Sequence, residues 1–415
     1  MGIPNETDVL IVGSGPAGAL LGTLLARRGI EVLVVDKQPD FERDFRGESL
    51  AAPSVLALRA LGFGDALEAH GYLSSTGVAM WLEGRQVFHV DYRRFTIGTL
   101  PIEFPQPPLI RMLHEAATGL PQHTFAAGTR FTSLIEHDGA VRGAVLRGPD
   151  GTTTKVRARL VVGADGRFSK VRKAAGLDPS VLQAERDLLS FRLPRPDGWE
   201  LRSELVVDRD RHLAVLPTYP DALRVSHNLP KRGLGALRAE GFDAFRERVA
   251  AIDPRLAPLV RTHLHSWEDT SFLEVFNASV SQWARDGLIL VGDASHTATP
   301  TLGQGVNLAI QDVVGLTPLI ASALADGARD GVVRAEVFAA FITARRKHKE
   351  FVTAFQRRQE ASLALHTPWQ TFLRRARMRT LDALPVKYRV FDRLLNQPHP
   401  VDPVDLRRPP HHPAP

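Results

Sequence analysis

The sequence predicts an α/β fold in which a parallel-sheet core is interrupted by an antiparallel sheet and followed by helices. Three observations predict it. The chain opens with an apolar stretch, a glycine-rich turn, a helical pattern and a second apolar stretch, DVLIVGSGPAGALLGTLLARRGIEVLVVDK. Two later segments, 74–99 and about 185–275, alternate apolar and polar residues as half-buried antiparallel strands do. From about residue 335 the pattern is helical and rich in arginine.

Composition limits the possible classes of protein. The 415 residues are 44% hydrophobic and 24% charged, which is typical of a globular protein with two or three folding units. The absence of cysteine excludes disulfides, thiol catalysis and zinc sites built on cysteine. The 15 histidines show no paired metal-ligand spacing, so no metal site is predicted.

Charge and hydropathy indicate where the protein works. The net charge of +6 suits an anionic cofactor, and because the charge is spread along the chain, we do not expect a nucleic-acid partner. The first residues lack the basic region of a signal peptide, and no apolar run reaches the roughly 18 residues of a membrane span. We therefore predict a cytoplasmic protein without stable membrane insertion.

The N-terminal turn GSGPAG indicates a Rossmann-like dinucleotide site. Gly13 would permit the tight turn, Gly15 would let a pyrophosphate approach the backbone, and Gly18 would let the helix pack against the strand. The free N–H groups of the helix start would face the phosphates. Asp36, at the end of the second strand, would accept hydrogen bonds from ribose hydroxyls. The predicted contacts are Gly13, Ser14, Gly15, Ala17, Gly18, Asp36 and Lys37.

Two further motifs follow in order. GADGRFSKVR, residues 163–172, comes after a predicted strand at Leu160–Val162, and GDASHTATPTLGQGVNLAIQD spans residues 292–312. Together with the first turn they resemble the FAD-dependent aromatic hydroxylases, the group A flavoprotein monooxygenases of the p-hydroxybenzoate hydroxylase type. The resemblance implies a Rossmann-like FAD-binding domain, an inserted and mostly antiparallel β-sheet domain for the substrate, and a C-terminal helical segment.

The resemblance also implies residue roles. Asp293 would bind the ribityl and phosphate region of FAD, and the loop and helix start at 303–307 would lie along the isoalloxazine ring, where N–H groups would stabilise negative charge. Gly305 would then have no room for a side chain, and glycine would also tolerate a positive φ in such a turn. The implied FAD contacts of the later segments are Arg46, Arg111, Asp165, Asp293, Gly303, Gln304, Gly305, Val306 and Asn307.

The implied reaction uses non-covalent FAD, NADPH or NADH, and O2. The reduced flavin would form a C4a-hydroperoxide whose distal oxygen is transferred to a phenol, quinone or heteroaromatic ring. No catalytic side chain is predicted, since the flavin carries the chemistry; Pro300 and His296 would lie near it, and His296 could equally be a loop histidine that bonds backbone. His212, Tyr219 and His227 are candidates for a base that deprotonates a phenol, although packing or surface roles are favoured.

Several alternatives stay open. The GES sequence at 47–49 also occurs in flavin-dependent halogenases, but their WxWxIP signature is absent. A reductase of related fold and a non-catalytic flavoprotein that binds a labile metabolite are the other readings. Arg167 and Arg172 could contact NADPH phosphates, although a solvated basic helix is favoured. The helical stretch FLRRARMRTLDAL could lie on a membrane surface, although a solvated face is favoured.

We expect a small aromatic substrate and a monomer or homodimer. The predicted organisation is an FAD-binding domain at 1–73, 100–184 and 276–334, a substrate domain at 74–99 and 185–275, C-terminal helices at 335–395 and a Pro-rich tail at 396–415.

Overall fold

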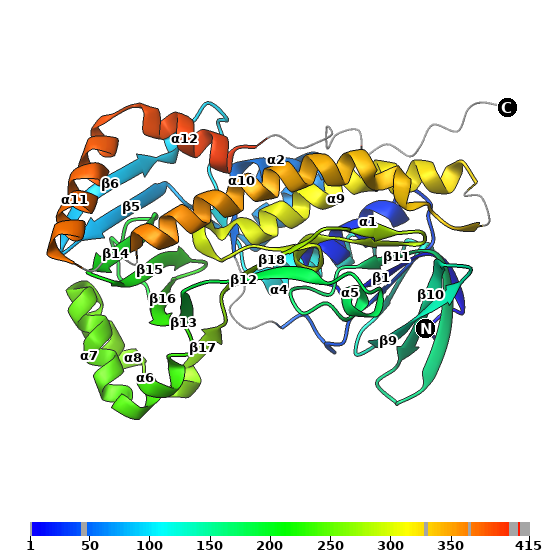
Figure 1. Ribbon diagram of the computed structural model, residues 1–415, viewed down its shortest axis with the longest axis horizontal. Helices are drawn as coiled ribbons and strands as arrows, with labels where there is room; N and C mark the ends of the chain where they lie inside the picture. Colours follow the sequence, from blue (N-terminus) through cyan, green and yellow to red (C-terminus); the bar gives the residue numbers. More distant parts are fainter. Residues whose placement is uncertain (1, 43–47, 328–330, 364–366, 398–405, 407–415) are drawn as a thin grey trace.

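The computed structural model describes residues 2–42, 48–327, 331–363, 367–397 and 406 (Figure 1). The molecule is elongated, with a large mixed sheet at one end and an antiparallel sheet at the other. Two long helices, α9 (Gln304–Ala325) and α10 (Ala339–Leu363), run side by side along it.

The mixed sheet has a parallel centre. β1 is flanked by β2 and β11, and both pairings are parallel, as are those of β2 with β8 and of β11 with β20. In spatial order the strands are β19 (Ala284–Arg285), β20 (Leu288–Leu290), β11 (Thr153–Gly163), β1 (Glu6–Val12), β2 (Val32–Val35) and β8 (His123–Ala126). An antiparallel pair, β9 (Arg130–His137) and β10 (Ala140–Arg147), extends from β11.

Helices cover this sheet and complete its core. In α1 (Pro16–Ala26) every residue from Ala17 to Ala26 is buried, because the helix lies between the sheet, α9 and α4 (Gln106–Glu115). By length and hydropathy the segment 301–325 could cross a membrane, contrary to the sequence expectation, but 67% of its apolar window is buried inside the protein. Such burial is typical of the central helix of a folded core.

The antiparallel sheet combines the two segments whose alternation predicted it. In spatial order its strands are β17 (Thr270–Leu273), β13 (Arg186–Pro194), β16 (Ala222–Pro230), β15 (Arg211–Thr218), β14 (Ser203–Asp208), β5 (Gly77–Leu82) and β6 (Arg85–Asp91). Only the β14–β5 pairing is parallel among these strands. One face packs against α6 (Leu234–Glu240), α7 (Phe242–Ile252) and α8 (Ala257–His263).

Short strands join the two large sheets. β7 (Ile102–Glu103) pairs with β3 (Ser49–Leu50) and β4 (Leu73–Ser74), and β18 (Phe276–Val280) pairs with β12 (Pro179–Gln183) and β21 (His296–Thr297). The remaining helices of this part are α2 (Ala52–Leu58), α3 (Gly64–His70) and α5 (Lys170–Ala174).

The C-terminal helices wrap the molecule. α10 packs on α9, and α11 (Pro368–Ala383) and α12 (Val386–Leu395) cover the β5–β6 end of the antiparallel sheet (Figure 1). The prediction that 335–395 is mainly helical is therefore confirmed for the described residues. The division of the chain into domains stays a prediction.

Candidate functional site

The glycines of the first turn have two different surroundings. A Cβ atom added to Gly13, whose φ is +105°, would lie 2.4 Å from the carbonyl oxygen of Ala164. At Gly18 it would lie 1.9 Å from the carbonyl oxygen of Gly13. At Gly15, by contrast, none of the described atoms would lie within 4 Å. Gly13 and Gly18 are thus required by the protein itself, whereas Gly15 leaves space for a ligand at the start of α1.

Asp36 ties this turn to the end of β2. Its Oδ2 accepts a hydrogen bond from the Ser14 N–H at 2.7 Å, and its Oδ1 accepts one from the Gln38 N–H at 2.9 Å. The side chain is buried, while the neighbouring Lys37 is exposed. Because each carboxylate oxygen can accept a second hydrogen bond, a contact from Asp36 to a ribose hydroxyl stays a prediction.

A buried histidine lies beneath the turn and was missed by sequence reasoning. His114 Nε2 of α4 lies 2.5 Å from Ser14 Oγ, and the imidazole packs against the ring of Phe125 at 4.1 Å between centroids. Burial, assisted by the nearby His123, lowers the pKa of His114 to about 4, so the ring is neutral at pH 7. No local signal joins two residues that stand 100 positions apart.

The second motif forms a capped helix. Asp165 Oδ2 accepts hydrogen bonds from the N–H groups of Lys170 (2.7 Å) and Val171 (3.1 Å), and Ser169 Oγ accepts one from the Arg172 N–H at 2.9 Å. These contacts satisfy the free N–H groups at the start of α5. Asp165 therefore has a structural role here, and its link to the cofactor stays a prediction.

Arg172 corrects the sequence analysis. A solvated basic helix was favoured for it, but its guanidinium is buried and donates to the carbonyl oxygens of Ala294 (2.9 Å) and Arg167 (3.0 Å). It joins the second motif to the third. Arg167 remains partly exposed and donates to the carbonyl oxygen of Glu274 at 2.9 Å.

The third motif begins with a turn at Gly292–Ala294, directly after β20. Gly292 has a φ of +60°, and a Cβ placed there would lie 3.5 Å from the Cβ of Ala17 in the first turn of α1. The partly buried Asp293 therefore lies close to the first motif. Thr297 Oγ1 donates to the Asp293 carbonyl oxygen at 3.1 Å and fixes the chain after the turn.

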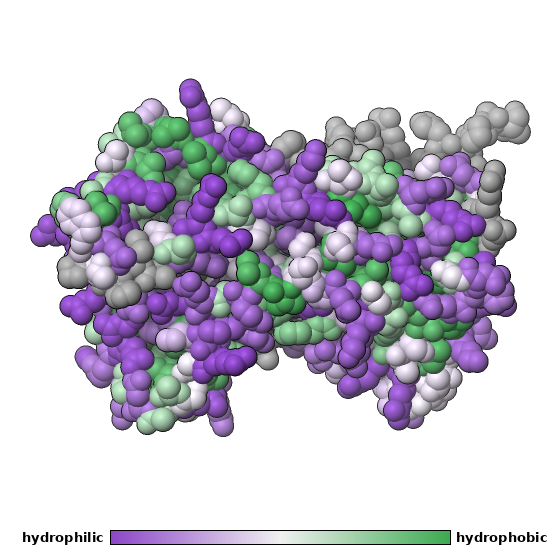
Figure 2. Space-filling view, in the orientation of Figure 1, coloured by the Kyte–Doolittle hydropathy of each residue, from purple (hydrophilic) through white to green (hydrophobic). Residues whose placement is uncertain are grey.

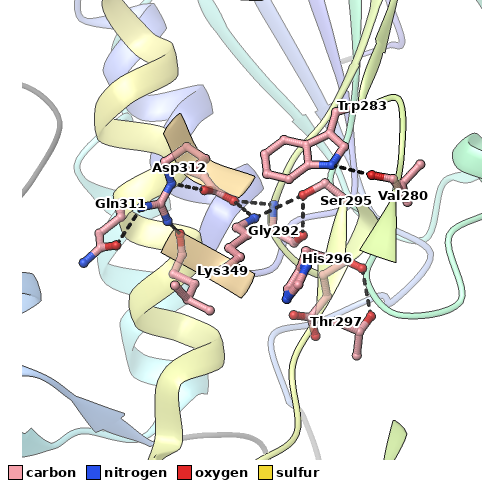
Figure 3. Close-up of polar contacts among 12 residues, drawn as sticks. Val280, Trp283, Gly292, Ser295, His296, Thr297, Gln311, Asp312 and Lys349 are labelled. Carbon is pink, nitrogen blue, oxygen red and sulfur yellow. Dashed lines mark hydrogen bonds and ion pairs between the residues drawn. The ribbon is translucent and has the colours of Figure 1, made fainter. Parts of the chain in front are cut away.

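A buried ionic cluster packs against the Gly292–Ala294 turn (Figure 3). Asp312 of α9 lies between two cations of α10: Arg345 Nε is 2.8 Å from Oδ1, and Lys349 Nζ is 2.6 Å from Oδ2. Asp312 Oδ2 also accepts a hydrogen bond from the Gly292 N–H at 3.2 Å, and Lys349 Nζ donates to Ser295 Oγ at 3.2 Å. The ammonium of Lys349 lies 4.4 Å from the centre of the buried Trp283 ring (Figure 3).

The charges of the cluster depend on one another. Burial disfavours the charged form of Asp312, but Lys349 and Arg345 outweigh it and hold the pKa of this carboxyl below its usual range. Burial likewise lowers the pKa of Lys349, against the attraction of Asp312. The cluster fixes α10 to α9 and to the Asp293 turn, so the backbone of the site is held in place by charges that cannot reach water.

In the loop before α9 the residues with positive φ precede Gly305, the position considered from the sequence. Positive φ angles occur at Leu302 (+66°) and Gly303 (+61°), whereas Gly305 lies in the first turn of α9 with ordinary helical backbone. Gly305 therefore does not use the positive φ that glycine would tolerate. None of the described atoms would lie within 4 Å of a Cβ at Gly305, so a lack of room there would have to come from the cofactor and stays a prediction. The protein leaves this position open.

Asn307 braces the loop against β3. Its Oδ1 accepts a hydrogen bond from the Ala51 N–H at 2.8 Å, and its Nδ2 donates to the carbonyl oxygens of Ser49 (3.1 Å) and Gly303 (2.9 Å). Gln304 turns back to the Leu302 carbonyl oxygen at 3.0 Å, and Val306 is buried. The side chains of this segment therefore shape the loop, and a contact from its backbone N–H groups to the cofactor stays a prediction.

His296 is directed to α10. Its Nε2 lies 3.0 Å from Thr353 Oγ1, and burial, with Lys349 nearby, lowers the pKa of the imidazole to about 3. The ring bonds a side chain on α10, and not backbone as the alternative reading expected. Pro300 is exposed beside the loop. Arg111 is half exposed, and its Nη2 lies 3.5 Å from Glu42 Oε1. Arg46 lies outside the described residues.

The three candidate bases differ in position. His227 faces the helices, 5.8 Å from the Phe245 ring, with neither ring nitrogen bonded to a described residue, and burial lowers its pKa to about 4. Burial lowers the pKa of His212 to about 3. His227 therefore has a packing role, whereas His212 lies on the opposite face of the sheet from Leu213. Tyr219 lines a cavity of about 350 Å³ with Glu48, Arg192 and Arg111 among others.

The site as a whole fits FAD. Gly13, Asp36, Asp165 and Asp293 follow β1, β2, β11 and β20, so all lie at the carboxyl edge of the parallel strands, where α/β sheets bind ligands. Gly15 and Gly305 leave open space at the starts of two helices. Helix starts and open glycines of this kind suit the pyrophosphate and the ring of a dinucleotide.

Comparison with known proteins decides the family. The family model described as an FAD binding domain matches residues 6–335. The chain belongs to this FAD-binding family. The 6-methylpretetramide 4-monooxygenase of Streptomyces rimosus is 37% identical over 327 residues, which cover 77% of this chain and 76% of that enzyme. The protein is an FAD-dependent monooxygenase.

Solved structures agree on the fold of this monooxygenase. The p-nitrophenol 4-monooxygenase PnpA of Pseudomonas putida DLL-E4 has a TM-score of 0.80 at 20% identity, covering 95% of this chain and 98% of that one. The myxobacterial FAD-dependent halogenase CndH has a TM-score of 0.75 at 18% identity, covering 97% and 96%. At these identities the likeness concerns the fold alone, and it extends to enzymes with different chemistry.

Proposed function

We propose that this monooxygenase hydroxylates a ring carbon of a phenolic, fused-ring aromatic substrate of the polyketide type. The proposal is carried by the 37% identity to the 6-methylpretetramide 4-monooxygenase over about three quarters of both chains. When bound, FAD reduced by NAD(P)H activates O2, with one oxygen atom going to the ring and the other to water. The protein has to hold the substrate, exclude water and accept the phenolic proton.

The antiparallel sheet offers a polar face for this substrate. Leu189, Phe191 and Val225 pack against α7 and α8, so alternation turns Ser190, Arg192, Arg224 and Ser226 to the opposite face. On that face Ser190 Oγ and Ser226 Oγ lie 2.8 Å apart, and the Arg192 guanidinium pairs with the buried Glu48. Hydroxyls and guanidinium groups in this arrangement suit the phenol and carbonyl oxygens of a polycyclic substrate.

Ser49 and Glu103 supply a route for the phenolic proton. The two Glu103 oxygens accept hydrogen bonds from Ser49 Oγ at 2.8 and 2.7 Å, and a Cβ at Gly303 would lie 3.2 Å from Ser49 Cβ. Burial raises the pKa of Glu103 to about 7, although Arg224 and Ser49 oppose the rise. A base with a pKa near the working pH is the most effective. We propose that Ser49 passes the phenolic proton to Glu103, since a phenolate is the better carbon nucleophile.

The substrate class is tested by product analysis. Purified holoenzyme is incubated with NADPH, 18O2, chloride and a panel of single-ring and fused-ring phenols. We expect one 18O atom in a fused-ring product, with NADPH oxidation stimulated by that substrate. Incorporation into single-ring phenols alone would reject the substrate class. A chlorinated product would instead make the protein a halogenase.

The proton route is tested by the pH dependence of kcat. Glu103 must be ionised to accept the proton, so we expect kcat of the natural protein to rise as pH increases through about 7. In Glu103→Gln this rise should disappear and kcat should fall by roughly a hundredfold, within the range of general-base catalysis. The exposed Glu115→Gln is the control. An unchanged pH profile in Glu103→Gln would remove Glu103 from the mechanism.

Location and assembly remain predictions. We propose a cytoplasmic enzyme, monomeric or homodimeric, whose partner is a small aromatic substrate.

A further inference from the structure

The helix α11 carries apolar side chains on its outer face. Trp369, Phe372 and Leu373 are 65, 57 and 47% exposed, and the first two rings stack with centroids 5.6 Å apart. The inner face is marked by the buried Thr371, Arg374 and Met378, at helical spacing. The buried Arg374 donates to the carbonyl oxygens of Ser362 (3.1 Å) and Arg209 (3.0 Å). The helix therefore buries an arginine and exposes its largest aromatic residues.

Further apolar side chains are exposed at the end of α11 and on α12. Leu384 in the connection and Val386 and Val390 of α12 are each more than 40% exposed. Figure 2 shows hydrophobic side chains gathered at this end of the molecule, over α12. We name this region the α11–α12 outer surface; its apolar members are Trp369, Phe372, Leu373, Leu384, Val386 and Val390.

Arginines are interleaved with these apolar residues. Arg377, Arg379, Arg389 and Arg393 are exposed on the same two helices. Both acidic residues of 368–395 are engaged: Asp382 accepts hydrogen bonds from Lys387 Nζ (2.6 Å) and the His89 N–H (2.8 Å), and Asp392 accepts one from Asn396 Nδ2 (2.9 Å). The outer surface therefore combines two signals, apolar side chains and unbalanced positive charge.

We propose that the α11–α12 outer surface binds reversibly to the face of an anionic lipid bilayer. Aromatic side chains with a polar edge prefer the boundary between headgroups and acyl chains, and arginines near it are attracted to anionic lipid. A second copy of this chain fits less well, because self-association through this surface would bring the four exposed arginines of each copy together against a single carboxylate per copy, Asp392, that no cation of 368–395 is seen to pair with. The mode is peripheral contact by two amphipathic helices, and it involves no spanning segment.

Vesicle flotation tests the proposal with the full-length holoenzyme. The probes are phosphatidylcholine vesicles and the same vesicles with about one third phosphatidylglycerol, an anionic lipid. We expect the protein to float with the anionic vesicles and only weakly with the neutral ones. In about 1 M salt the Debye length falls to about 3 Å, so the attraction between arginines and anionic lipid is screened and the protein should be released. Absence of flotation with the anionic vesicles, or equal flotation with both kinds, would overturn the proposal.

Matched variants distinguish vesicle binding through this surface from non-specific binding of exposed apolar residues. Trp369→Ser with Phe372→Ser should reduce binding to anionic vesicles at least tenfold, as should Arg377→Gln with Arg379→Gln. Phe168→Ser is the control, because Phe168 is 68% exposed but lies outside this surface, and it should bind as the unaltered protein does. Flavin content and NADPH oxidation in solution confirm that each variant is folded.

The same variants identify a competing occupant. Sedimentation of the protein without lipid would reveal a dimer, and a dimer lost in the Trp369→Ser, Phe372→Ser variant would assign the surface to a second copy and overturn the lipid proposal. Equal loss of vesicle binding in the Phe168→Ser control would also overturn it.

Discussion

The two glycine-rich segments of the cofactor site look alike in sequence and differ in what surrounds them. In the first turn, side chains at Gly13 and Gly18 would collide with backbone oxygens of the protein. In the first turn of α9, Gly305 faces open space, and a Cβ at Gly303, just before this helix, would lie 3.2 Å from the Cβ of Ser49. The fold therefore requires glycine at Gly13 and Gly18, and at Gly303 because of its φ of +61°, whereas at Gly305 it leaves room where the cofactor is predicted to lie.

The largest effect is expected at Gly18. In Gly18→Ala the new Cβ would meet the Gly13 carbonyl oxygen at 1.9 Å, and the backbone would have to move. We expect a loss of about 3 kcal/mol in the free energy of unfolding, the upper part of the range for overpacking. Urea unfolding of the FAD-free protein measures it. Gly15→Ala is the control, because none of the described atoms lies near its Cβ. Equal stability of the two variants would break the comparison.

The second effect concerns cofactor binding without loss of the fold. Gly305→Val should leave far-UV circular dichroism unchanged but weaken FAD binding by at least about a hundredfold, or about 2.7 kcal/mol, because the side chain would occupy the space left for the ring. Flavin content and NADPH oxidation report the loss.

The matched control for Gly305 is Gly235→Val. Both glycines are the second residue of a helix with no described atom within 4 Å of the added Cβ, but Gly235 is exposed on α6. The two variants therefore share the helix-propensity cost of valine. Another exposed glycine, Gly327, is not a suitable control, because its φ of +62° would put any other side chain into a strained backbone conformation. Full flavin content in Gly305→Val would show that this loop does not line the cofactor.

The smallest effect is expected at Asp36. Asp36→Ala removes the acceptor of the Ser14 N–H and the predicted acceptor of a ribose hydroxyl. A hydrogen bond to a charged group contributes about 1.5–3 kcal/mol, so we expect FAD binding to weaken by roughly tenfold or more. Fluorescence titration of the FAD-free variant with FAD measures it. An unchanged dissociation constant would confine Asp36 to holding the turn.

Sequence reasoning predicted those parts of the fold around the site that depend on short motifs within a single segment. The β1–α1–β2 unit, the positions of Gly13 and Gly18 and the alternation of the antiparallel strands all follow from the order of residue types along a few turns. The FAD-dependent monooxygenase family was predicted from the order of three such motifs, and it is confirmed.

The contacts that hold the motifs together were not predicted. Ser14 contacts His114 and Arg172 contacts Ala294 across 100 and 122 residues, and only the folded chain brings them together. One signal was available for the ionic cluster. Arg345 and Lys349 occupy the same helical stripe as the buried Phe341 and Val352, so two cations on an apolar face indicated a buried anion, which is Asp312.

The position of β1 has a consequence for how the chain is made. This strand leaves the ribosome well before its partner β11, which ends at Gly163, and before the next strand of the sheet, β20, which ends at Leu290. Parallel neighbours so distant in sequence close late. During synthesis the first glycine turn is therefore present long before the Asp293 turn and α9 can complete the site. FAD bound by both turns, as predicted, could therefore enter only after α9 has been synthesised, and release of the nascent protein before that point would leave the apolar β1–α1 unit exposed to aggregation.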